Sequence, residues 1–434
     1  MFAAFTLFMI SYGLVFFVCD FGTDTKARIA AIFGLTVHQI TTMVQVYVRP
    51  LPTVNGDPVS LNHYASKTGG EHLQGNKIAN DLRRAYEIFD GNHLFGCEIA
   101  QVGFALSLVF LVKLCHQTKS SKPLASIICL YSLVPSSVLN TSVILRESWQ
   151  MAGYLGLTFC LLSLRQEGLT PKLILTPFLI FILSYVHNGF GPIIILTVPF
   201  VVMWGLKSIE GSREIALVLA LFFGATLGNK AFNALKTRSV LLQKVAEGRA
   251  FNYINEYSDN VARAASDFPV RLDISSINAT LTTGPATLAY YLYSPFIWDV
   301  KRPIDLYGLP ESFLRIWLTL LTIAGLIKTK PNEEKNQRKI LLWMWLAAEL
   351  VWAAGTANWG TAIRHRLPAF GLLLISGLKA RESMKAEGSK TSEEPQKQNK
   401  PKQNNSPRSR RRETNKKMRE RNQRINARKS RRNP

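Results

Sequence analysis

The sequence predicts an all-α, polytopic bundle of about eleven transmembrane helices, and three observations lead to this class. Apolar residues make up 47% of the 434 positions. Runs of about 15 to 20 residues with few charges recur along most of the chain, which is the length that a helix needs to cross a bilayer. Basic residues gather in every second short loop, as they do on the cytoplasmic side of membrane proteins. We therefore expect a multi-pass protein.

The predicted helices follow one another with few long gaps. Pro135 interrupts the fourth, and the eleventh is short. The eleven spans fall near residues 3–18, 27–46, 96–115, 122–138, 149–164, 172–186, 190–206, 214–230, 311–328, 340–354 and 367–378.

The basic loops predict the orientation of the chain. By the positive-inside rule their common side is the cytoplasm, and the basic tail belongs to it. We expect an inner or plasma membrane location with a cytoplasmic C-terminus. The loops are marked by Lys26 and Arg28, Lys113 to Lys122, Arg165 and Lys172, Lys207 and Arg213, and Lys328 to Lys339.

Two long loops, 48–95 and 230–310, fall on the opposite side of the predicted membrane. Most connections between helices are far shorter, and long loops in compact folds are usually functional. The first contains an amphipathic segment with Leu73, Ile78, Leu82, Tyr86 and Phe89 on one helical face. We therefore expect the chemistry on the extracytoplasmic side.

The C-terminal residues have a different character, which divides the chain into a transmembrane domain (1–378) and a tail (379–434). The tail carries 20 Lys and Arg but 6 Asp and Glu, so it holds +14 of the net charge of +23. It lacks apolar periodicity, and we expect it to be disordered. Anionic lipid is the expected partner of the tail, because no aromatic residues are interleaved to favour nucleic acid.

The clearest candidate site is the stretch from Asn358 to Pro368, NWGTAIRHRLP, between two apolar segments. Arg364 and Arg366 offer planar, permanently charged groups that match phosphate oxygens, while His365 can shuttle a proton. Asn358 fits a structured turn that lines the same site. We predict a lipid-phosphate site here; the alternative is that these residues only anchor a helix end among lipid headgroups.

Two further polar positions interrupt apolar sequence on the same predicted side. Arg146 and Glu147 lie between Pro135 and Gln150, where a structural ion pair and a substrate contact are both open. His187 lies in SYVHNGFGP beside a glycine-containing turn, as a catalytic residue or a local hydrogen bonder. The sequence contains none of the phosphate-loop, serine-hydrolase or zinc-protease motifs.

Four stretches of the sequence form a recognisable set. They are GEHLQGNKIANDL, VPSSVLNTSVILRESW, YYLYSPFIWDVKRPIDLYGLPESFL and NWGTAIRHRLPAFGLLL. Together they resemble the polytopic bacterial glycosyltransferases of the GT-C superfamily, the exopolysaccharide or O-antigen polymerase-like proteins. The resemblance implies a polyprenyl phosphate or diphosphate sugar donor, a glycan acceptor, an outward-facing site and an inverting transfer. Glutamate stands at position 71 where that family has aspartate.

Direct displacement of a lipid phosphate by an acceptor hydroxyl needs a general base. Glu71, in the first outer loop, is the predicted carboxylate, and the alternative is a solvated loop residue. Asp81, Glu87 and Asp90 on the same loop are competing carboxylates, and His187 and His365 are the other candidates. A divalent cation is left open: one variant of the hypothesis uses a metal with Glu71, the other uses arginine and histidine alone.

The predicted function is a membrane glycosyltransferase or polysaccharide polymerase. The main alternative is a transporter or flippase for lipid-linked saccharides, which would carry internal repeats and broken helices at mid-membrane. No convincing repeat relates the two halves of the sequence. A non-catalytic membrane assembly protein that uses its basic tail as the contact is the third possibility.

Overall fold

The computed structural model describes most of the chain, and every regular element in the described part is helical. The chain forms two compact units, Met1–Met384 and Lys385–Pro434. The helix bundle and the candidate site belong to the first unit. The described residues are 1–48, 57–66, 77–120, 123–167, 175–187, 189–194, 197, 267–270, 272–273, 276–301, 303–328, 333–356 and 358–397.

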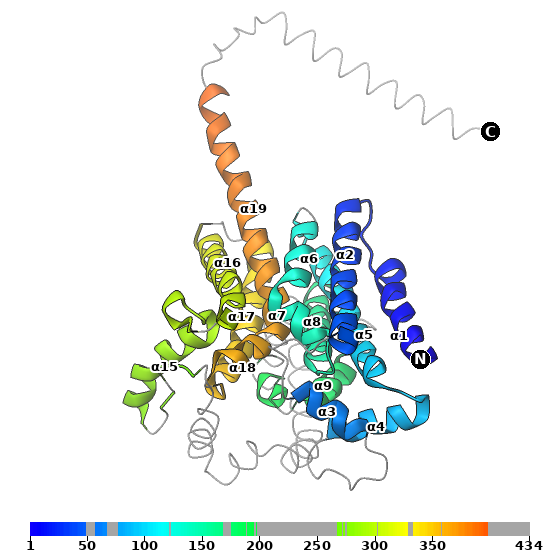
Figure 1. Cartoon of the computed structure of the whole chain (residues 1–434). Helices are drawn as coiled ribbons and strands as arrows, with labels where there is room; N and C mark the ends of the chain where they lie inside the picture. The colour runs from blue at the N-terminus through cyan, green and yellow to red at the C-terminus, as the bar shows by residue number, and fades with distance from the viewer. Residues whose placement is uncertain are drawn as a thin grey trace, which may run out of the picture. The chain divides into compact units, whose positions relative to one another are not determined.

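The helices are arranged as a bundle (Figure 1). Short 3-10 turns at Ile297–Asp299 and Pro303–Tyr307 connect α15 to α16. The helices are α1 (Phe2–Gly13), α2 (Thr25–Met43), α3 (Asp57–Ser66), α4 (Lys77–Phe89), α5 (His93–Gln117), α6 (Leu124–Leu133), α7 (Pro135–Thr141), α8 (Glu147–Glu167), α9 (Leu175–Val186), α15 (Ile277–Tyr293), α16 (Leu309–Lys328), α17 (Glu333–Ala354), α18 (Trp359–His365) and α19 (Leu367–Lys397).

Three helical stretches in the described part are long and apolar enough to cross a membrane: Thr25–Val48, His93–Gln117 and Asp305–Lys328. A fourth exists if the bent pair α6 and α7 is one span, with a 59° bend at the break before Pro135, where the proline ring cannot continue the helix. These four overlap predicted spans. The predicted total of about eleven is not confirmed.

The remaining predicted spans differ in their outcome. Helix α17 covers the predicted span 340–354, but Arg338, Lys339 and Glu349 interrupt its apolar run. The apolar helices Phe2–Val18 and Leu175–Val186 are short of a full crossing. The span 214–230 and most of the span 190–206 lie outside the described residues.

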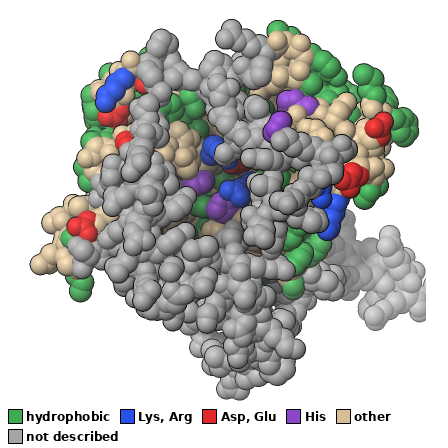
Figure 2. Space-filling model, turned by 60° about the horizontal axis from the view of Figure 1, so that its bottom comes forward, with side chains coloured by type: hydrophobic (Ala, Val, Ile, Leu, Met, Phe, Trp, Pro, Cys, Tyr) green, Lys and Arg blue, Asp and Glu red, His purple; other side chains and the backbone are tan. Residues whose placement is uncertain are grey.

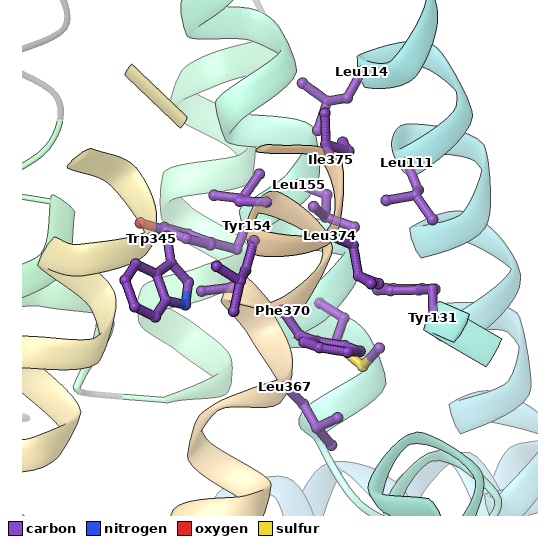
Figure 3. Packing of buried hydrophobic residues seen from close by; sticks show 14 of the residues in the cluster. Leu111, Leu114, Tyr131, Tyr154, Leu155, Trp345, Leu367, Phe370, Leu374 and Ile375 are labelled. Atoms are coloured by element: carbon purple, nitrogen blue, oxygen red, sulfur yellow. The ribbon is translucent and has the colours of Figure 1, made fainter. Parts of the chain in front are cut away.

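Helices α5 and α19 form the centre of the bundle. In α5, 83% of the apolar window is buried, against 39% in the other two long candidates. Figure 3 shows Phe370 and Leu374 of α19 surrounded by side chains of α5, α6, α8 and α17. Between helices in a membrane, such contacts stabilise the bundle through close van der Waals packing. The predicted eleventh span, 367–378, is therefore among the best packed parts of the molecule.

The predicted start of the tail at 379 falls inside a helix, because α19 continues to Lys397. Lys379 is buried, and its Nζ lies 3.6 Å from a carboxylate oxygen of Glu334 at the start of α17. Residues 398–434 lie outside the described part.

Most of the amphipathic segment in the predicted outer loop forms helix α4, while its first apolar residue, Leu73, lies outside the described residues. Its apolar residues Leu82 and Tyr86 are buried against Phe95 and Ile144, whereas Ile88 and Phe89 are exposed at its end. Figure 1 shows α3, α4, α9 and α18 at one end of the bundle, the lower end in that view. The Tyr185 hydroxyl, on α9, donates a hydrogen bond to Asp81 of α4.

Candidate functional site

Helix α18 carries the basic cluster, and Asn358 starts it. The Asn358 side-chain oxygen accepts a hydrogen bond from the backbone N–H of Thr361 at 2.8 Å, the usual N-cap interaction. The helix has seven residues and ends at His365, with Arg366 as its C-cap and Pro368 in the first turn of α19. Asn358, predicted to contact substrate, is buried and uses its oxygen as this cap.

An ion pair links α18 to the start of α8. Arg364 donates through Nε and Nη2 to Oε1 of Glu147, at 2.9 and 2.7 Å. The Glu147 side chain is 3% exposed and that of Arg364 is 25% exposed. The carboxylate sits in the first turn of α8, where the helix dipole favours negative charge. Glu147 therefore fixes one edge of a guanidinium that still reaches the surface.

Two histidines lie beside this ion pair. The ring centroids of His187 and His365 are 6.0 Å apart, although they come from the end of α9 and the end of α18. The indole of Trp352, on α17, stacks on His365 with centroids 4.4 Å apart and meets His187 edge-on at 4.6 Å. The tryptophan therefore holds the two imidazoles at a fixed separation.

The hydrogen bonds of the histidines determine where each neutral ring carries its proton. The backbone N–H of Gly189 donates to Nδ1 of His187 at 2.9 Å, so a neutral His187 carries its proton on Nε2. The Thr356 hydroxyl donates to the backbone oxygen of Trp352 at 2.7 Å, and it lies 2.9 Å from Nδ1 of His365. Because the hydroxyl proton is committed, His365 donates through Nδ1 and its Nε2 is a proton acceptor.

Both histidines are neutral at physiological pH. Burial, together with the positive charges of Arg146 and Arg364, lowers the pKa of His187 and that of His365 far below the ordinary value of about 6.5. Arg146 directly precedes Glu147, so two guanidinium groups and two imidazoles belong to one cluster. Figure 2 shows basic and histidine side chains gathered at the centre of the face that lies at the bottom of Figure 1.

Arg366 has a different environment from Arg364. Its side chain is 1% exposed, and its guanidinium donates to the backbone oxygens of Ala362, Leu292 and Ser294 at 3.1, 2.7 and 3.0 Å. These contacts join the end of α18 to the end of α15. They support the site from within the protein.

We expect Arg366→Ala to destabilise the fold by about 3–5 kcal/mol, because it leaves buried carbonyl oxygens without their donor. Thermal unfolding of the purified protein and its level in the membrane are the measurements. Arg366→Lys should recover part of the loss. An alanine variant that keeps its melting temperature but loses activity would assign Arg366 to the substrate instead.

The structure thus brings together Arg146, His187, Arg364 and His365 from the predicted site. Glu71, the predicted carboxylate base, lies outside the described residues. Sequence reasoning weighed Glu147 only as a partner of its neighbour Arg146, and it did not anticipate Thr356 or Trp352. A threonine and a tryptophan near the end of an apolar helix do not by themselves indicate a functional site.

Among the described residues, no group of three or more His, Cys, Asp or Glu side chains is placed to hold a metal ion. The five cysteines are free thiols. Comparison of the whole chain with protein-family models, with curated proteins and with solved structures finds no match.

Proposed function

We propose that the protein is a membrane glycosyltransferase or polysaccharide polymerase of the GT-C type. It would act on the extracytoplasmic face of an inner or plasma membrane, with a polyprenyl phosphate or diphosphate sugar as donor and a glycan as acceptor. The observation that carries the proposal is the meeting of two arginines with two neutral histidines of opposite tautomer. A basic cluster that also holds a proton acceptor suits transfer from a phosphate leaving group.

The arginines supply the phosphate contacts in this proposal. Arg364 is oriented by Glu147 and remains partly exposed, and Arg146 acts on the same histidines. Preorganised positive charge stabilises the developing phosphate in the transition state more than the donor in the ground state. Arg366 and Asn358 hold α18 in place beneath the phosphate.

His365 is the proposed general base. The acceptor oxygen forms its bond to the anomeric carbon while the bond from that carbon to the phosphate oxygen breaks. The electron pair of the broken bond leaves with the phosphate, and the acceptor proton passes to Nε2 of His365. His187, whose Nε2 carries a proton, would donate a hydrogen bond to a phosphate oxygen.

Glu71 remains the alternative base. In that variant the carboxylate of the first outer loop takes the proton, and a divalent cation assists the phosphate. Dependence of transfer on both Glu71 and an added metal would select this variant, and independence from both would select the histidine.

Lipid binding tests the phosphate assignment directly. The full chain in nanodiscs would be titrated with polyprenyl monophosphate, and the polyprenol of the same length would serve as the control without phosphate. We expect the phosphorylated lipid to raise the melting temperature, and Arg364→Ala to remove this shift. An equal shift from the polyprenol would contradict a phosphate site.

The depressed pKa of His365 predicts an unusual pH dependence. An ordinary histidine base, with a pKa of about 6.5, would be neutral in roughly 3% of molecules at pH 5 and would lose about 30-fold in rate. His365 favours the neutral form in the free enzyme, so kcat/KM should stay nearly flat from pH 7 to pH 5. A fall centred near pH 6.5 would contradict the assignment.

A transporter of lipid-linked saccharides is the second candidate. The buried polar faces of α2 and α5 favour it, because ionisable and amide side chains inside membrane bundles often mark transport pathways. A non-catalytic assembly protein, the third, would need no proton acceptor beside its arginines. Inactivation of the protein distinguishes them. Loss of a transferase leaves lipid-linked saccharide on the outer leaflet, whereas loss of a transporter leaves it on the inner leaflet.

A further inference from the structure

A second polar cluster lies between α2, α5 and α7, on helices outside the histidine site. Gln39 and Thr42 lie one turn apart on α2, and Glu98 and Gln101 lie one turn apart on α5. Their side chains meet across the two helices. Gln101, Glu98 and Gln39 are 0%, 1% and 4% exposed. This is an oxygen-rich contact in the interior of an otherwise apolar bundle.

The hydrogen bonds fix the orientation of the Gln101 amide. The Thr42 hydroxyl donates to the backbone oxygen of Ser142 at 3.0 Å, so it can only accept from Gln101, 2.9 Å away. The same amide nitrogen lies 3.4 Å from the backbone oxygen of Thr141, also an acceptor. Nε2 of Gln101 must therefore face Thr42 and Thr141, and Oε1 is the amide atom that points away from these two residues.

The Gln39 amide is fixed in the same way. Its Nε2 donates to Oε2 of Glu98 at 3.0 Å. Three buried oxygens then have no hydrogen-bond partner in the described part of the chain: Oε1 of Gln39, Oε1 of Glu98 and Oε1 of Gln101. All three are acceptors, and a buried acceptor without a donor costs about 1–3 kcal/mol.

We propose that these three oxygens bind a monovalent cation, with sodium as the first choice. Carboxylate and amide oxygens are the ligands that hard cations prefer. The cation would satisfy the surplus of acceptors and neutralise Glu98 in the membrane interior.

The charge of the cluster favours a monovalent ion. Glu98 is the one carboxylate in this contact among the described side chains, so it balances a single positive charge. A divalent ion would keep an uncompensated charge in a medium of low dielectric constant, which is costly. The cluster also touches the backbone of Thr141 and Ser142, four to five residues before Arg146, so a bound ion would brace the approach to the histidine site.

Thermal unfolding of the full chain in nanodiscs, at constant ionic strength, tests the site. Sodium chloride would replace choline chloride stepwise at neutral pH. We expect a saturable rise in melting temperature of about 3 °C at ten times the dissociation constant. Gln101→Leu and Glu98→Gln should remove the sodium dependence, and Gln117→Leu, a change of the same kind at the other end of α5, should keep it.

The wild-type titration decides the matter even if a variant fails to fold. An unchanged melting temperature on replacement of choline by sodium would overturn the proposal. Stabilisation by acidification alone, with no response to sodium, would also overturn it and identify the occupant as a proton on Glu98. Loss of the sodium response in Gln117→Leu would show that the effect does not arise at this cluster.

Discussion

Arg364→Ala is expected to lower the transfer rate by about 100- to 1000-fold, the usual effect of removing one preorganised charge from a transition state. The side chain is oriented by two hydrogen bonds to Glu147 and still reaches the surface, so it can meet a phosphate. The loss should appear in kcat as well as in kcat/KM, because the charge on the leaving phosphate grows during the reaction. Sugar transfer by purified protein is the measurement.

Two variants sharpen the test. Arg364→Lys keeps the charge but loses the planar fork, and we expect it to recover only part of the activity. Arg28→Ala removes an exposed arginine from the predicted cytoplasmic end and should leave transfer unchanged. Normal transfer by Arg364→Ala, at a normal protein level, would remove Arg364 from the mechanism.

Removing the proposed base should cost about as much. His365→Ala is expected to lower kcat by about 100- to 10,000-fold, the range for loss of a general base. His116→Ala is the matched control. His116 lies in the last turn of α5, where it hydrogen-bonds the backbone oxygen of Asp20, and it does not contact the site.

Thr356 provides an independent check on the tautomer. Thr356→Val removes the hydroxyl that accepts the Nδ1 proton of His365, so the ring is free to place its proton on Nε2. We expect a smaller loss in kcat, of about 10-fold if nine rings in ten adopt the wrong tautomer, with KM nearly unchanged. Full activity in both Thr356→Val and His365→Ala would return the base assignment to Glu71.

The sequence was sufficient to predict much of the helical architecture. Candidate crossings at 25–48, 93–117 and 305–328 follow from long apolar runs, and Pro135 marks the bend between α6 and α7. The total of about eleven spans was less predictable. Charged residues such as Arg338 and Glu349 are tolerated in α17 because neighbouring helices bury them, and hydropathy alone does not contain that information.

The candidate site was predictable in parts. Arg146, His187 and the pair Arg364 and His365 were each visible as polar interruptions near helix ends. The sequence did not predict that these residues meet, because Glu147 and Arg364 are 217 residues apart. The different environments of Arg364 and Arg366 follow from helix geometry, since residues two apart point to opposite faces.

The Glu98 cluster has one signal in the sequence. A carboxylate within a predicted span is costly unless something compensates it, and Glu98 lies inside the span predicted at 96–115. Its glutamine partners could not be predicted in the same way, because amides at one-turn spacing gain meaning only when two helices face each other.

In the proposed reaction, Arg364 and His365 carry the transfer of sugar from a lipid phosphate on the outer face. The most direct measurement is gene replacement with Arg364→Ala or His365→Ala, followed by analysis of surface glycan and of the leaflet that holds lipid-linked saccharide. At normal protein levels, we expect loss of long glycan and accumulation of lipid-linked saccharide on the outer leaflet. Accumulation on the inner leaflet would identify a transporter, and glycan indistinguishable from wild type would remove both residues from the chemistry.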